Sequence, residues 1–181
     1  MLKRKIKRAL SYCFVLFLMA VLTLLMSSRH DRVSGIPVLN YHGIENEAGN
    51  PLMLGVSDFE RQMAYLAKEG YQSISPQQLV AYLQDGKPLP EKSVLITFDD
   101  GYKNNYTQAY PIMKKYGLTG TIFLVTDTVG RDDWYLDWEQ VREMRRDGFV
   151  FGSHTLNHLP LSDLTPEEIM FQLVRSKEGI E

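Results

Sequence analysis

The sequence predicts an α/β protein built on a parallel β-sheet that is either doubly wound or closed into a barrel. From residue 36 onward, short apolar segments alternate with segments of helical periodicity. One of the short segments, Val94–Phe98, is rich in β-branched and aromatic side chains, as expected for a buried strand. It ends in Asp99, Asp100 and Gly101. Because α/β proteins bind ligands at the carboxyl ends of parallel strands, these acids mark a candidate site.

The composition excludes several classes of function. The chain of 181 residues has room for one domain and an appendage, and its apolar and charged fractions are those of a globular protein. A formal net charge of -2 argues against nucleic acid as a partner. Cys13 is the only cysteine, so neither an intrachain disulfide nor a cysteine-based metal site can form.

The N-terminal segment has the pattern of a signal anchor. A basic tail at residues 1–8 precedes an apolar stretch at 9–26, which predicts one transmembrane helix with the N-terminus in the cytoplasm. The competing interpretation is a cleaved signal peptide and a secreted protein. Residues 27–35 then form a linker to a domain at 36–181 outside the cytoplasm.

Five strands and five helices follow from periodicity and from cap residues. The strands are predicted at residues 37–41, 72–74, 94–98, 119–126 and 149–153. The helices are predicted from Ser57, with Glu60 as a capping-box partner, to Gly70; from Ser75 and Pro76 to Gly86; over 106–116 with a kink or restart at Pro111; from Asp137 to Arg146; and from Thr165 and Pro166 onward.

The second polar cluster follows the last predicted strand. His154 and His158 are separated by three residues, so both imidazoles can face one point if the segment turns helically. Two imidazoles and one carboxylate form a three-ligand site for zinc or a similar divalent ion, with a position open for water. A surface or capping role is the alternative for the histidine pair.

The two acids can divide the work of hydrolysis between them. If one of Asp99 and Asp100 binds the metal, the other is free to act as a base on water. The residues themselves do not assign the order, and a simple turn at a strand end is the alternative. His42 closes another strand and can donate a proton to a leaving group; a partly buried, satisfied histidine is its alternative.

Aromatic residues precede the helix that begins after Asp137. Trp134, Tyr135 and Trp138 offer a stacking surface for sugar rings or, alternatively, cover the core.

Two motifs resemble those of a known enzyme family. Thr97–Asp100 and Ser153–His158 resemble the first two motifs of the polysaccharide deacetylases, the NodB-homology or carbohydrate esterase family 4 enzymes. These are metal-dependent hydrolases with a distorted (β/α) barrel that remove acetyl groups from sugars. Leu39–Gly43 is similar to a segment of the branch that deacetylates poly-β-1,6-N-acetylglucosamine.

The resemblance implies a role for each candidate residue. It makes Asp99 the general base and His42 the general acid, with Asp100, His154 and His158 as metal ligands. The implied cofactor is a divalent metal ion, zinc first, with cobalt, nickel and iron as alternatives. The implied partners are a polymer of N-acetylglucosamine and, through the N-terminal helix, a membrane.

The resemblance covers residues 36–181 and leaves out the later motifs of the family. We therefore expect an incomplete barrel in a C-terminally truncated chain, unless something else completes it. The alternatives to a poly-N-acetylglucosamine deacetylase are an inactive, membrane-anchored sugar-binding or scaffold module and a deacetylase of peptidoglycan or chitin-like oligomers.

Overall fold

The computed structural model describes residues 17, 19, 35–46 and 50–181. The chain divides into two units, Met1–Gly35 and Ile36–Glu181. The signal anchor predicted at 9–26 lies outside the described residues, apart from Phe17 and Met19. In the part of the chain that is described, no helix has both the length and the apolar character needed to cross a bilayer.

The second unit is an α/β fold with a parallel sheet, as predicted. The sheet consists of β1 (Val38–Tyr41), β4 (Gln72–Ile74), β5 (Ser93–Phe98), β6 (Thr121–Leu124) and β7 (Val150–Ser153). Every pairing is parallel: β1, β4 and β6 each pair with β5, and β7 pairs with β6. All six residues of β5 are buried, so the strand that carries the two acids is the centre of the unit.

A second, two-stranded sheet was not predicted. It pairs β2 (Gly43–Ile44) with β3 (Met53–Leu54). Strands of two residues are too short to show the alternation by which a strand is recognised in a sequence.

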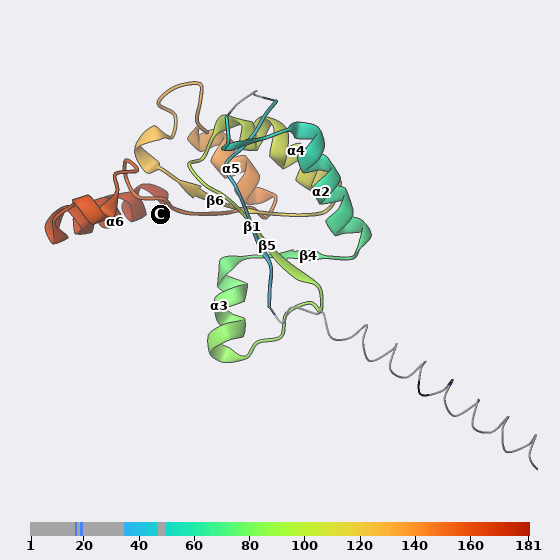
Figure 1. Ribbon diagram of the computed structural model, residues 1–181. Helices are drawn as coiled ribbons and strands as arrows, with labels where there is room; N and C mark the ends of the chain where they lie inside the picture. The colour runs from blue at the N-terminus through green and yellow to red at the C-terminus, as the bar shows by residue number, and fades with distance from the viewer. Residues whose placement is uncertain (1–16, 18, 20–34, 47–49) are drawn as a thin grey trace, which may run out of the picture. The chain divides into compact units, whose positions relative to one another are not determined.

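The helices begin and end close to their predicted positions. They are α2 (Val56–Lys68), α3 (Pro76–Asp85), α4 (Tyr110–Lys115), α5 (Trp138–Arg146) and α6 (Pro166–Ile180), with a π-helix, η1 (Asn105–Ala109), before α4. Figure 1 shows α2, α4 and α5 gathered over one side of the sheet, with α3 apart from them and α6 beside β7.

The core lies between the sheet and the helices α2, α4 and α5. Alternate residues of β5, Val94, Ile96 and Phe98, are fully buried in it. Phe98 stacks on Tyr41 of β1 at 5.5 Å between ring centroids, and the edge of Phe59 from α2 meets both rings, at 5.2 and 5.9 Å. Because this face of β5 is apolar, its other face is available for polar residues.

The caps show where local signals decide a helix boundary. Ser75, Asp137 and Thr165 each form the predicted N-cap, with a complete capping box. The capping box predicted at Ser57 is wrong, because α2 begins at Val56 and its N-cap is Gly55, two residues before the predicted cap. The Val56 N–H donates to Asn46 Oδ1 at 3.1 Å, so an acceptor ten residues away replaces the serine.

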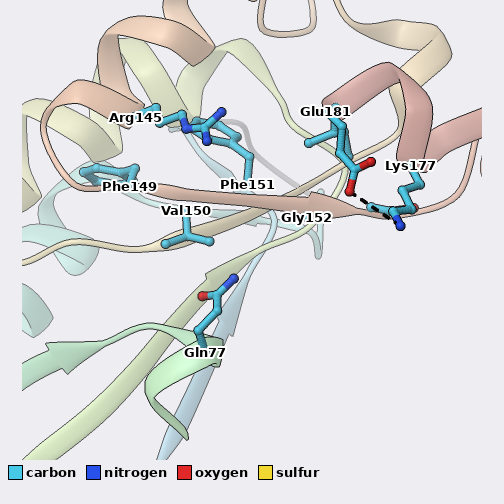
Figure 2. A pocket seen from close by; sticks show the side chains of 10 residues that line it. Gln77, Arg145, Phe149, Val150, Phe151, Gly152, Lys177 and Glu181 are labelled. Carbon is cyan, nitrogen blue, oxygen red and sulfur yellow. Dashed lines mark ion pairs between the residues drawn. The ribbon is translucent and has the colours of Figure 1, made fainter. Parts of the chain in front are cut away.

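The β7 strand borders a hollow of about 570 Å³, shown in Figure 2. Among the described residues β7 has one strand neighbour, β6. Arg145 of α5 also lines the hollow, and so does the ion pair between Lys177 of α6 and Glu181, the C-cap residue of that helix, at 3.6 Å. The hollow therefore follows an unpaired edge of the sheet.

Candidate active site

The strand register brings the polar residues of β1 and β5 to one face. Asn40 lies opposite Thr97 in the parallel pair. Side chains two residues apart on a strand share a face, which places His42 beyond Asn40 and Asp99 beyond Thr97 on the same side. The predicted meeting of strand ends at one edge is therefore present in the structure.

Asp99 is held by a short chain of hydrogen bonds. Asn40 Nδ2 donates to Asp99 Oδ2 at 3.0 Å, and the Thr97 hydroxyl donates to Asn40 Oδ1 at 2.7 Å. A carboxylate only accepts hydrogen bonds, so the amide must turn its NH₂ toward Asp99 and its oxygen toward the hydroxyl. His42 Nε2 lies 3.9 Å from the same Asp99 oxygen.

Asp100 turns in another direction because its backbone is left-handed, with φ 70°. Its side chain is 11% exposed, and Oδ1 is a buried atom with no hydrogen-bond partner. Gly101 follows with φ 75°, where a Cβ would lie 2.7 Å from Leu124 Cδ2. Only glycine combines that backbone conformation with that close approach.

His154 and His158 converge on the orphaned oxygen of Asp100. Their Nε2 atoms lie 3.5 and 3.4 Å from Asp100 Oδ1 and 3.1 Å from each other. The helical turn assumed for this segment is wrong: Thr155 and His158 have φ values of 69° and 63°, and no helix forms. Two left-handed residues bend the loop so that both rings face one point.

The tyrosine that lies two residues after Asp100, Tyr102, has a raised pKa. Tyr102 stacks on Tyr135 at 5.6 Å between centroids. Burial, together with the negative charge of Asp100, raises the pKa of Tyr102 to about 12. The phenol therefore remains a neutral hydrogen-bond donor at neutral pH.

The donor set of Asp100, His154 and His158 fits a divalent cation. One ligand atom from each lies within 4.8 Å of the other two. A buried carboxylate oxygen without a donor is costly. A cation held by this oxygen and two imidazole nitrogens removes that cost, and a site with one carboxylate and two histidines is typical of zinc and of other transition metals.

The family profile described as polysaccharide deacetylase matches residues 86–181, which include both acids and both histidines. The chain belongs to the polysaccharide deacetylase family. This confirms the resemblance seen in the two motifs.

Two curated relatives extend beyond the chain. YxkH of Bacillus subtilis, itself assigned to the polysaccharide deacetylases, is 40% identical over 148 residues, which cover 82% of this chain and 52% of YxkH. The poly-beta-1,6-N-acetyl-D-glucosamine N-deacetylase of Escherichia coli is 34% identical over 142 residues, which cover 68% of this chain and 21% of that enzyme. The chain thus spans about half the length of one relative and about a fifth of the other.

Two solved structures have a similar fold. The deacetylase PplD of Streptococcus pyogenes, determined with acetate, superimposes with a TM-score of 0.75 at 30% identity over 79% of this chain and 66% of PplD. IcaB of Ammonifex degensii gives a TM-score of 0.71 at 29% identity over 81% of this chain and 68% of IcaB.

The remaining sequence candidates have different surroundings in the structure. Trp134 is 65% exposed, Tyr135 is half-buried on Tyr102, and Trp138 packs against the core. Sequence analysis missed Asn40, which contacts Asp99, and Gln172 of α6, which contacts the histidine loop. Neither residue has a clear sequence signal, because the importance of Asn40 depends on strand register and that of Gln172 on how α6 docks.

Proposed function

We propose that the chain is a metal-dependent N-deacetylase of a polysaccharide that contains N-acetylglucosamine, with poly-N-acetylglucosamine as the favoured substrate. The observation that carries this proposal is the convergence of His154 and His158 on the buried oxygen of Asp100, next to Asp99 and His42. The name of the E. coli relative, which specifies that polymer, supports this choice of substrate.

In this proposal, Asp100, His154 and His158 hold the metal. When bound, a divalent ion supplies Lewis acidity to the acetyl carbonyl and makes water a stronger acid. Zinc is the favoured ion, and cobalt, nickel and iron are alternatives.

Asp99 acts as the general base. Its Oδ2 accepts the amide N–H of Asn40, which fixes the plane of the carboxylate and leaves Oδ1 to take a proton from the attacking water. His42 lies on the same side of the sheet edge and donates a proton to the departing amine. The oxygen of water ends in acetate, its proton goes to Asp99, and the amine left on the sugar receives a proton from His42.

The proposal extends to the parts of the chain not described by the structure. We place a signal anchor at residues 9–26, with the basic tail 1–8 in the cytoplasm and the domain at 36–181 outside the cell membrane. The open β7 edge and the hollow beside it support a distorted barrel of the NodB type that these strands leave incomplete.

The test is acetate release by the whole chain in detergent from oligomers of β-1,6-linked N-acetylglucosamine, with chitin oligomers and peptidoglycan as competing substrates. We expect release that a chelator abolishes, that added zinc restores and that Asp99→Asn lowers by at least about 100-fold. If the folded, metal-loaded protein releases no acetate from any of these three substrates, the enzyme hypothesis is refuted and the sugar-binding module is favoured.

A further inference from the structure

Helix α6 buries two polar residues against the protein and leaves four large apolar side chains exposed. Gln172 is 5% exposed and Ser176 is fully buried, whereas four large apolar side chains of the same helix are 43–61% exposed, namely Met170, Phe171, Leu173 and Val174. A helix normally docks through its apolar stripe. The buried face of α6 therefore serves specific hydrogen bonds instead of apolar packing.

Gln172 contacts the loop between the two histidines. Its Oε1 accepts the backbone N–H groups of Leu156 and Asn157, both at 3.2 Å. Since both contacts come from N–H donors, the atom that faces them must be the amide oxygen. One side chain thus satisfies two consecutive donors that lie between His154 and His158.

The loop depends on such support because its backbone is unfavourable. Thr155 and His158 are left-handed, a conformation that costs a residue other than glycine about 1–2 kcal/mol. The segment has neither helix nor strand bonding of its own. Two N–H groups without an acceptor would favour relaxation of the loop, and relaxation would move the two imidazole nitrogens apart.

Ser176 fixes the start of the same loop from one turn further along α6. Its hydroxyl lies 2.6 Å from the Ser153 hydroxyl, which in turn accepts the Thr155 N–H at 3.1 Å. Gln172 and Ser176 therefore hold the loop both before and between its two histidines.

We propose that Gln172 is a positioning residue for the metal site: its amide oxygen fixes the loop backbone so that His154 and His158 stay preorganised around Asp100. The inference rests on the proposed function, because it concerns the same three ligands. It adds a role for α6, an element that contributes no ligand.

The test compares two substitutions of similar size. Gln172→Met keeps the volume and removes the acceptor, whereas Gln172→Glu keeps an oxygen in the same place. Gln84→Met, on the exposed surface of α3, is the matched control. The readout is a Co²⁺ titration of the metal-stripped whole chain in detergent, followed by visible absorption, which reports affinity and ligand geometry independently of activity.

We expect Gln172→Met to weaken Co²⁺ binding by about 10–100-fold and to change the spectrum. Gln172→Glu should bind at least as well as the original chain, and Gln84→Met should match it. If the Met variant does not fold, Gln172→Asn replaces it, because its shorter side chain does not reach the loop; the same loss is expected there.

Two results would overturn the inference, and they are distinguishable. Original affinity and spectrum in Gln172→Met or Gln172→Asn would refute the positioning role alone. A folded original chain that does not bind Co²⁺ would refute the metal site, and therefore the proposed function together with this inference.

Discussion

Asp99 and Asp100 are neighbours in the chain, yet the backbone gives them different surroundings. Asp99 continues the strand direction and meets Asn40, whereas the left-handed Asp100 turns toward the histidines. The two carboxylates therefore do not compete for one partner. In the proposed mechanism, this separation allows Asp99 to accept a proton while Asp100 binds a cation.

Thr97 is the residue whose replacement tests the support of Asp99. Its hydroxyl orients the Asn40 amide, so Thr97→Val, which is nearly the same size, should leave Asp99 without a fixed partner. We expect kcat for acetate release to fall about tenfold, the equivalent of about 1.4 kcal/mol, with KM unchanged. Thr97→Ser keeps the hydroxyl and should retain kcat; equal losses in both variants would contradict this role.

One contact between helices depends on a carboxylate at the protein surface. Asp147, which follows α5, accepts the Tyr110 hydroxyl of α4 at 2.5 Å and pairs with Lys114. Lys114 first, and Tyr110 second, lower the pKa of Asp147. The contact is thus one that acid can break.

The pH dependence of stability follows from that pKa. Because the folded-state pKa of Asp147 lies below the unfolded value of about 3.9, its stabilisation is complete above that pH and is lost as the pH falls through the folded-state pKa. We expect Asp147→Asn to lower the free energy of unfolding at pH 6 and to flatten its decline below pH 4. Urea unfolding at several pH values measures both; parallel curves for the two proteins would contradict the assignment.

The sequence predicts most elements of the fold because their signals are local. Three helices are capped by residues whose partners lie three positions away, namely Ser75, Asp137 and Thr165. Strand β5 is recognisable because it is rich in β-branched and aromatic side chains. Predictions fail where the deciding partner is distant or the conformation is atypical. Asn46 replaces Ser57 as the acceptor for α2, and the left-handed Thr155 contradicts the preferences of a β-branched residue.

The candidate site shows the same division. Five candidate residues stand out in the sequence because they follow apolar strands, namely His42, Asp99, Asp100, His154 and His158. Asn40 and Gln172 do not, because their importance depends on register and on helix docking. Residues that contact a reacting group are thus easier to find from sequence than the residues that orient them.

At the scale of the molecule, the three proposed metal ligands come from two strand ends that only the folded sheet brings together. Asp100 follows β5 and the histidines follow β7, with β6 between these strands. A metal that binds the folded state and not the unfolded chain stabilises the whole unit.

Metal should therefore change the stability of the protein. Zinc at 100 times its dissociation constant should raise the free energy of unfolding by about 2.7 kcal/mol, and a chelator should reverse the effect. Thermal unfolding with and without zinc measures the shift. Asp100→Asn should abolish it and Asp85→Asn, an exposed acid on α3, should keep it; an undiminished shift in Asp100→Asn would exclude Asp100 as a ligand.

The left-handed residues of the site link the thermostability of the protein to its affinity for metal. Among the described residues, Asp100, Thr155 and His158 are the only ones other than glycine with positive φ, and all three belong to the site. Selection of variants for heat tolerance alone should favour glycine or asparagine at these positions, because these residues relieve the strain. Thermostability obtained in this way would come at the expense of metal affinity, so a screen must select for both.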